Sequence, residues 1–589
     1  MKRPLLTCAL LLCGVADAPA DPSTTHRLFA GGDTMLARQL PARVLEHGPA
    51  WPLSPLADLI RGADVALVNL ECVISARGAF WDKGERNPYY YRAPPWMIEV
   101  LTAGGIDVVM TANNHAMDFG PEALLDQQRL LDAVNIAAAG SGGNLDEAAQ
   151  PRYVKVGDIV LAVIGLTTYN REVAARADRA GVLWGDDPSR ILDLLGPAVA
   201  AARRHADLVI FSPHWGGNWT ERPTPQRIEL AHALIDLGVD AILGHSAHQV
   251  HGIEIYKGRP IVYDMGNLLW DTPLPRRGQW SAGYLLEFDR NGFTRLDVYP
   301  LELQAGRTVP AEGAAFDRIR EMILALSTGL DPDIAFRAAP GSLGVDLRPE
   351  PRPRSERTPP ARIYAAGGDV RMPDTLRTLR GNVVHASAPA WARAAPPVAL
   401  AHGVEFLGAR VPEVVRSGSG FSAEVALRVS GALEPGWQGM IRGVRRHADG
   451  EFFWAHPVAD GNWLPEDWRS GETGIDLTLV RPPHLAGGTY DLSWRLERVD
   501  GAGVIGPAAG GPSDGFIPIG EIWVGSLGVP RGVSGVSWSG QPDARVRLLR
   551  AFNLTREVIV AAAWTGGALL AAALLALSAV LWRRHLAKT

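Results

Sequence analysis

The stretch Val108-Val-Met-Thr-Ala-Asn-Asn-His-Ala-Met-Asp118 places a short apolar strand directly before two amides, an imidazole and a carboxylate. The same arrangement recurs through residues 26–305, where apolar strands are predicted at Leu28–Gly31, Val65–Leu70, Val108–Thr111, Ile159–Gly165, Leu208–Ser212 and Ala241–Leu243. Helix-like stretches separate them, at Gly120–Val134, Ser189–Arg204 and Pro225–Leu237. Short, near-continuous apolar strands that alternate with helices predict an α/β sheet covered on both faces.

Polar side chains follow the carboxyl ends of these strands, where α/β folds bind their ligands. We expect one hydrolase-like site there, built from Asp33, Glu71, Asn114, His115, His214, His245 and His248. Carboxylates and neutral imidazoles suit divalent zinc, manganese or iron, and an open position on such a metal activates water. The pattern leaves open which metal binds and how many ions are held. A metal-free site, in which a histidine–carboxylate pair acts as acid and base, is the alternative.

Individual residues of this set have competing interpretations. Asp33 follows a Gly-Gly pair that we expect to form a turn, and its carboxylate could instead cap the next helix. Asp118 is expected to brace His115 and is placed with it in the catalytic pair. His251 is a third histidine in the same short loop as His245, and three ligands from one such loop strain the geometry.

Length and composition restrict the class of protein. The chain of 589 residues exceeds what one hydrophobic core normally organises, which predicts about two to four domains. The net charge of −5 and the lack of a basic stripe give no reason to expect nucleic-acid binding. Cys8 and Cys13 fall in a predicted leader, so Cys72 alone is expected to remain, and neither an intramolecular disulfide nor a multi-cysteine zinc site is expected.

Both ends of the chain carry membrane signals. Residues 1–20 have the order of a secretory signal peptide: a basic start, a short apolar run and small residues at a cleavage site. Residues 558–582 form an uncharged apolar stretch long enough to span a bilayer, and the basic residues in 583–589 predict a cytoplasmic tail. We therefore expect a single-pass protein of the cell membrane with most of its chain on the extracytoplasmic side.

The pattern changes after residue 305. Residues 306–395 are expected to hold one helix, Ala315–Leu330, and a Pro/Arg-rich linker, Arg348–Pro360. Residues 396–530 alternate apolar and polar side chains between turn residues, which predicts an antiparallel β-sandwich. Its tryptophans could line a glycan-binding face or be ordinary core and edge residues; they are Trp437, Trp454, Trp463, Trp468 and Trp494.

Six motifs in order resemble the CapA-type poly-γ-glutamate capsule biosynthesis proteins, which are related to calcineurin-like metallophosphoesterases. They are Gly-Asp-Thr-Met-Leu, Val-Asn-Leu-Glu, Thr-Ala-Asn-Asn-His-Ala-Met-Asp-Phe-Gly, Pro-His-Trp-Gly, Gly-His-Ser-Ala-His and Tyr-Asp-Met-Gly-Asn. The resemblance implies a four-layer α/β/β/α metallophosphatase-like sandwich with metal ligands at Asp33, Glu71, Asn114, His214, His245 and His248. It also implies that His115 protonates a leaving group. Thr34 and Met35 follow Asp33 where phosphoesterases have Asp-x-His, so the number of metal ions stays open.

Two functions are consistent with these features. The leading hypothesis is a membrane-anchored protein of capsule or related envelope-polymer biosynthesis that acts as a metal-assisted hydrolase or transferase. Its expected partners are poly-γ-glutamate or a glycan, and other subunits of a biosynthesis complex. The alternative is a non-enzymatic subunit that handles or assembles the polymer.

Overall fold

A computed structural model describes residues 25–525, apart from gaps at 84–87, 272–275, 351, 353–357, 368–383, 386–388, 390, 393–396, 413, 417–420, 435, 447–449, 457, 462–464, 466–467, 481–486, 500–502 and 508–513. The predicted signal peptide and the predicted membrane span at 558–582 lie outside the described residues. Within those residues, no helix combines the length and the apolar character needed to cross a bilayer.

The larger of two main sheets has ten strands. Along its hydrogen-bonded path it runs β19 (Arg337–Ala339), β20 (Ser342–Asp346), β17 (Gly292–Gln304), β16 (Trp280–Asp289), β1 (His26–Thr34), β2 (Val65–Leu70), β5 (Val108–Met110) and β6 (Ala137–Ala139). Off this path, β15 (Asn267–Leu269) pairs with β1 and β18 (Arg307–Pro310) with β17. The strands β1, β2, β5 and β6 are parallel, so their carboxyl ends share one edge.

The second main sheet has seven strands. Its order is β13 (Ile253–Tyr256), β14 (Arg259–Val262), β12 (Ala241–Leu243), β11 (Leu208–His214), β9 (Ile159–Thr167), β8 (Arg152–Val156) and β21 (Tyr364–Ala365). The strands β9, β11, β12 and β14 run parallel to one another. This sheet therefore also has an edge at which several carboxyl ends meet.

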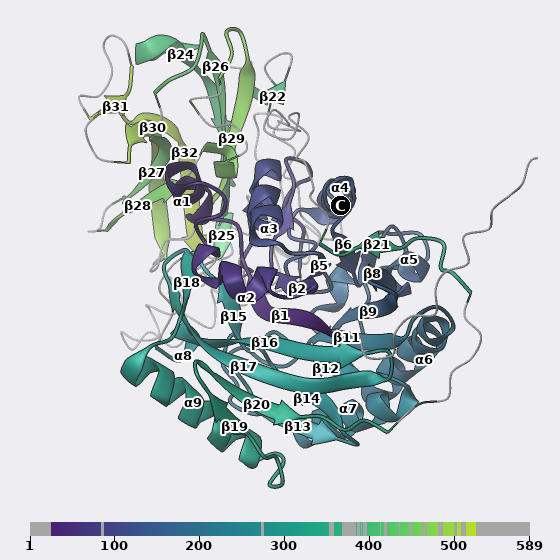
Figure 1. Ribbon diagram of the computed structural model, residues 1–589. Coiled ribbons are helices and arrows are strands. Elements are labelled where there is room, and N and C mark those ends of the chain that lie inside the picture. The colour runs from purple at the N-terminus through teal and green to yellow at the C-terminus, as the bar shows by residue number, and fades with distance from the viewer. Residues whose placement is uncertain are drawn as a thin grey trace, which may run out of the picture.

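The two sheets face each other across one core, to which β1 contributes Leu28, β2 Leu67, β9 Val163 and β11 Ile210. On the outer face of the ten-stranded sheet lie α2 (Ala57–Arg61), α3 (Ile98–Gly104) and α4 (Gly120–Ala133). On the outer face of the seven-stranded sheet lie α6 (Pro188–His205) and α7 (Pro225–Leu237) (Figure 1). The central strands are buried on both faces, which explains their near-continuous apolar sequences. The predicted α/β class is confirmed.

The sheets continue beyond residue 305. The strands β18, β19 and β20 extend the ten-stranded sheet, and α9 (Gly313–Thr328) places Ile319 and Ile323 in the core between the sheets. The predicted helix at Ala315–Leu330 is therefore present, but it belongs to the α/β unit. The additional strands are short and lie among glycines, prolines and charges, so their sequences lack the long apolar run by which the earlier strands were predicted.

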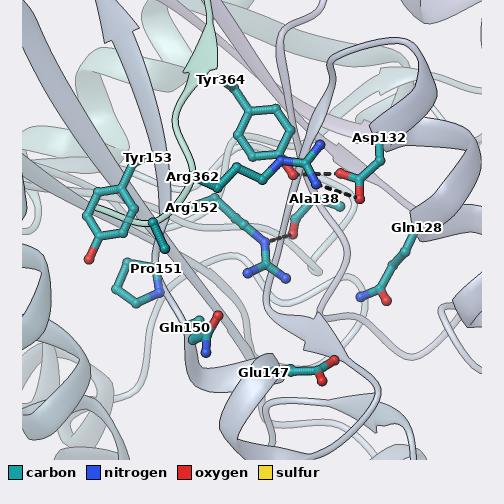
Figure 2. Close-up of a pocket in the computed structure, with 11 residues that line it drawn as sticks. Gln128, Asp132, Ala138, Glu147, Gln150, Pro151, Arg152, Tyr153, Arg362 and Tyr364 are labelled. Atoms are coloured by element: carbon teal, nitrogen blue, oxygen red, sulfur yellow. Dashed lines mark hydrogen bonds and ion pairs between the residues drawn. The ribbon is translucent and has the colours of Figure 1, made fainter. Parts of the chain in front are cut away.

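After the Pro/Arg-rich stretch the chain returns to the α/β unit as β21. This strand pairs with β8, and Tyr364 Oη donates to Asp132 Oδ1 of α4 at 2.6 Å. Arg362 forms an ion pair with Asp132 Oδ2 at 3.0 Å. Figure 2 shows both side chains pointing at Asp132 above a cavity that Arg152 also lines. This returning segment joins the edge of one sheet to a helix that covers the other.

Shorter elements complete this part of the chain. Two small ribbons are formed by β3 (Val73–Ile74) with β4 (Arg92–Ala93), and by β7 (Ser141–Gly142) with β10 (Gly181–Val182). The remaining helices are α1 (Leu40–His47), α5 (Leu145–Ala149) and α8 (Arg276–Gln279), with 3-10 turns η1 (Ser54–Leu56), η2 (Pro95–Met97) and η3 (Arg171–Val173).

The β-rich region forms two sheets with a core of their own. One runs β22 (Val384–His385), β29 (Thr473–Val480), β26 (Phe421–Val429), β24 (Val404–Arg410) and β23 (Val398–Ala399). The other runs β25 (Val414–Arg416), β32 (Ile517–Gly525), β30 (Gly488–Arg498), β27 (Trp437–Arg445) and β28 (Glu451–His456), with β31 (Val504–Ile505) beside β30. Short 3-10 turns lie at η7 (Ala401–Gly403) and η8 (Val458–Gly461).

The tryptophans of this region belong mainly to its interior. Trp468 and Trp494 are buried in the shared core, and the half-buried Trp437 and Trp454 pack against that core. Trp463 lies outside the described residues. The described tryptophans therefore agree better with core and edge roles than with a row of exposed binding residues.

Candidate functional site

Asp33 lies on a strand and not after a turn. The strand β1 continues through Gly31 and Gly32 to Thr34, and Asp33 pairs in register with Asn267 of β15. A Cβ on Gly32 would lie 1.9 Å from the carbonyl oxygen of Gly266, so only glycine permits this approach of the two backbones. The expected Gly-Gly turn is corrected accordingly: the glycines allow two strands to come close, which buries Asp33 at the sheet edge.

Asp33 and Glu71 form a buried acidic pair, both with 0% exposure. Burial raises the pKa of Asp33, but the hydrogen bond and charge of His248 outweigh it and hold this pKa well below its usual range. Burial and the neighbouring Asp33 carboxylate together raise the pKa of Glu71 well above its usual range. Neither oxygen of Glu71 has a hydrogen-bond donor among the described residues. Two such carboxylates need a shared proton or a cation between them.

His248 lies directly beside both acids. Its Nδ1 is 3.1 Å from Asp33 Oδ2 and 3.0 Å from Asn267 Oδ1, and its Nε2 is 3.7 Å from Glu71 Oε1. Ligand atoms of Asp33, Glu71 and His248 all lie within 4.8 Å of one another, close enough to share one metal ion. The mixed oxygen and nitrogen donors and the undonated Glu71 oxygens fit a divalent cation.

His214 and His245 reach the same point from the seven-stranded sheet, where their backbones form a parallel bridge. His245 Nδ1 lies 4.0 Å from Asp33 Oδ1, and its Nε2 is hydrogen-bonded to Ser212 Oγ at 2.7 Å. Burial lowers the pKa of His214 to about 3 and that of His245 to about 4. Both rings are therefore neutral at pH 7, the state in which imidazole binds metals.

Asn69 connects Asp33 of the ten-stranded sheet with His214 of the seven-stranded sheet. Its Nδ2 donates to Asp33 Oδ1 at 2.7 Å and lies 3.2 Å from His214 Nδ1. Its Oδ1 accepts from Asn113 Nδ2 at 3.0 Å. Asn113, and not the predicted Asn114, thus makes the amide hydrogen bonds to the cluster. Asn114 keeps a buried Oδ1 with no hydrogen-bond donor among the described residues, so this oxygen is available to a ligand.

His115 is held at the other side of Glu71. Its Nδ1 lies 2.7 Å from Asp118 Oδ2, its Nε2 lies 4.0 Å from Glu71 Oε1, and its ring stacks on Tyr91 at 4.1 Å. Burial lowers the pKa of His115 to about 4 although Asp118 opposes that shift. Lys83 Nζ donates to Asp118 Oδ1 at 2.7 Å, and both side chains are fully buried. Asp118 therefore braces His115 as the sequence predicts.

His251 points away from the cluster. Its Nε2 is 2.7 Å from the carbonyl oxygen of Thr220, and the pKa of the ring is lowered to about 4 by burial. Asp264 supports the histidine loop from below by accepting the Ala247 N–H at 2.7 Å and the Gly266 N–H at 2.9 Å. The loop thus contributes His245 and His248 to the cluster and uses its third histidine elsewhere.

Sequence reasoning missed several residues of this site. Asn69 carried a usable signal, because an amide inside a buried apolar strand must find hydrogen-bond partners. Lys83 carried none, because it lies in a segment without strand or helix periodicity. Tyr91 begins a Tyr-Arg-Ala-Pro stretch that resembles a turn of the family, but that resemblance did not indicate a contact with His115. Their role depends on how that segment folds over His115 and Asp118, which neighbouring residues do not reveal.

Known proteins match this chain in the region that contains the cluster. The family model described as "Bacterial capsule synthesis protein PGA_cap" matches residues 27–272. The chain is 35% identical over 265 residues to the "Probable polyglutamine synthesis accessory protein" of Mycobacterium tuberculosis, covering 43% of this chain and 69% of that protein. It is 25% identical over 348 residues to "PGA biosynthesis protein CapA" of Bacillus subtilis, covering 58% and 89%.

A third relative, "Capsule biosynthesis protein CapA" of Bacillus anthracis, is 27% identical over 285 residues, covering 48% of this chain and 69% of that protein. The family match at residues 27–272 spans all the residues of the strand-end cluster, from Asp33 to His248. The resemblance predicted from the motifs is thereby confirmed: the chain belongs to the CapA-type family of poly-γ-glutamate capsule synthesis proteins.

Proposed function

We propose that this chain is a metal-assisted hydrolase or transferase that acts on an envelope polymer outside the cytoplasmic membrane. The observation that carries the proposal is the buried Asp33–Glu71 pair: the Glu71 oxygens have no hydrogen-bond donor among the residues that the structure describes, and imidazoles lie beside them. Two relatives named CapA, one for PGA biosynthesis and one for capsule biosynthesis, support poly-γ-glutamate as the polymer. The two end segments at 1–20 and 558–582 support export and a single membrane anchor.

The proposed fold assignment is a metallophosphatase-like α/β/β/α sandwich followed by a β-sandwich domain. The helix, sheet, sheet, helix order and the strand-end position of the cluster support it. Asp33, Glu71 and His248 would hold the first divalent ion, with His214, His245 and Asn114 as further ligands. Such an ion supplies Lewis acidity and lowers the pKa of bound water.

His115 is the proposed proton carrier. Its Nδ1–H donates to Asp118, which leaves the lone pair of Nε2 directed toward Glu71 and the reacting centre. The lowered pKa keeps this ring neutral at pH 7, so Nε2 accepts a proton from the attacking group. Asp118 stabilises the resulting imidazolium, which then gives the proton to the leaving group.

The test uses the purified full chain and measures both metal content and the release of products from γ-glutamyl oligomers and phosphoesters. We expect bound divalent metal, turnover, and a loss of about 100-fold or more in kcat for His115→Ala. His245→Ala should lose metal as well. His251→Asn is the control, because that ring lies off the cluster and should leave both properties intact. The proposal would be contradicted if the chain bound no metal, showed no turnover and did not respond to these changes.

A non-enzymatic polymer-binding role is the second candidate, and the separate core of the β-rich region favours it. Under this alternative, polymer binding persists in His245→Ala and is lost when the residues after Gly367 are removed. Retention of binding by the α/β unit alone, with loss in His245→Ala, would exclude it. Equilibrium binding of fluorescently labelled polymer distinguishes the two outcomes.

A further inference from the structure

A second cavity, of about 420 Å³, adjoins the strand-end cluster, and Tyr169, Trp215, Gly216 and Arg227 line it. The Tyr169 ring lies 5.7 Å from that of His214, which immediately precedes Trp215 in the chain. Ser246, in the loop of His245, donates its hydroxyl to the Gly216 carbonyl at 3.2 Å. The cavity and the cluster therefore share a wall.

The unusual group in this cavity is the guanidinium of Arg227. Among the residues that the structure describes, it forms no ion pair and no side-chain hydrogen bond. Three other arginines differ in this respect, since Arg203, Arg259 and Arg352 all form ion pairs with Asp240. Arg227 is thus a half-buried cation in a cavity wall, with no counter-ion among the described residues.

The surroundings of Arg227 hold it in place without neutralising it. Its guanidinium lies over the Trp215 ring, 5.6 Å from the centroid, and a Cβ on Gly216 would lie 2.8 Å from one of its nitrogens. Burial lowers the pKa of Arg227, while the more distant Asp264 and Tyr169 act in the opposite direction. Asp186 also lines the cavity, but its side chain is exposed.

An unpaired guanidinium stacked on an aromatic ring is suited to planar anions. Its fixed fork binds a carboxylate with two parallel hydrogen bonds, and a partly desolvated site strengthens that interaction. A chain of acidic units that lies across the cluster would bring a neighbouring carboxylate over this cavity.

We propose that this cavity binds a carboxylate of an acidic polymer whose chain also passes the cluster, and that Arg227 selects for its negative charge. This inference rests on the proposed function for the identity of the polymer, because it takes γ-linked glutamate as the acidic chain. Arg227 is a binding residue here and takes no part in proton transfer.

The experiment compares two ligands that differ in charge: a γ-linked glutamate oligomer and the same oligomer with its free α-carboxylates amidated. Binding is measured by calorimetry on the metal-loaded full chain carrying His115→Ala, which prevents turnover. Arg227→Gln should weaken binding of the acidic oligomer about tenfold or more and leave binding of the amidated oligomer unchanged. Arg227→Lys should fall between, because it keeps the charge and loses the fork.

Arg320→Gln is the matched control, since it removes the same charge from helix α9, where Arg320 pairs with Asp317 and lies over the ring of Phe316. Equal weakening of both oligomers by Arg227→Gln, or no weakening of either, overturns the inference. Turnover is measured separately in the chain with His115 intact. Binding that depends on Arg227, without turnover, would contradict the proposed hydrolase activity and support the binding site. Turnover without discrimination between the two oligomers would support the hydrolase activity and contradict the binding site.

Discussion

Lys83 and Asp118 form an ion pair in which both side chains have 0% exposure. Lys83 also donates to the carbonyls of Tyr89 and Asn114, so its three donor directions are used. We predict that Lys83→Met and Asp118→Asn each lower the free energy of unfolding by about 3–5 kcal/mol, because each leaves one buried charge without its partner. The double variant should lose much less than the sum. Urea unfolding of the four chains measures this coupling, and strictly additive losses would contradict it.

His251 makes the stability of the chain depend on pH. Its pKa is about 4 in the folded state, because of burial, against 6.5 ordinarily. Below pH 6.5 the unfolded chain gains a proton at this residue and the folded chain does not, so its contribution to stability is complete above 6.5 and declines toward pH 4. The full loss is about 3 kcal/mol.

The measurement compares wild type with His251→Asn by urea unfolding at pH 7 and pH 4.5. The buried histidines of the cluster titrate in both chains and cancel in the comparison. We expect wild type to lose more stability than the variant on acidification. If the stability of the two chains changed equally with pH, His251 would be protonated equally in the folded and unfolded states.

At the scale of elements, the parallel pairing of β1 with β15 determines where Asp33 lies. We predict that Gly32→Ala destabilises the chain by about 1–3 kcal/mol or more and reduces metal binding, because the new Cβ meets the backbone of Gly266 at 1.9 Å. Gly31→Ala is the matched control, since its Cβ meets the flexible end of Leu268 at 2.7 Å. Thermal unfolding and metal content measure both variants. Equal effects at the two glycines would rule out the backbone contact as the cause.

The parallel strands and their helices could be predicted from the sequence because each is a local pattern. The strand β2 was expected at Val65–Leu70 and is found there, and α7 was expected and found at Pro225–Leu237. The antiparallel strands β16 to β20 were not identified, because they lie outside the alternating strand–helix pattern. The residues of the site divide in the same way, into those with a local sequence pattern and those without one. Strand-end residues such as His245 were found, whereas Lys83 depends on tertiary contacts that no local pattern encodes.

At the scale of the whole molecule, the cluster lies where the two main sheets meet. In the ten-stranded sheet, Asp33 lies near the carboxyl end of β1 and Glu71 directly after β2. In the seven-stranded sheet, His214 is the last residue of β11 and His245 lies just after β12. A bound ion would therefore link both sheets, while the β-rich region has a core of its own. Metal binding should consequently stabilise one part of the chain and leave the other unchanged.

We predict that Mn²⁺ or Zn²⁺ at 100 times its dissociation constant stabilises the α/β unit by about 2.7 kcal/mol. Differential scanning calorimetry should show its unfolding transition rise with metal and fall with chelator, while the transition of the β-rich region stays constant. Glu71→Gln should abolish the shift. An equal shift in both transitions, or a shift that survives in Glu71→Gln, would be inconsistent with metal held at this cluster.

The return of the chain as β21 also has a consequence for how the protein is made. Until Tyr364 has left the ribosome, β8 lacks β21 beside it and presents an open edge to other nascent chains. The α/β unit therefore cannot complete its sheets when His251, the last histidine of the loop, has been synthesised; it must wait for more than a hundred further residues. Domains generally fold as units during synthesis. The late strand thus delays closure of the first unit until translation of the β-rich region is about to begin.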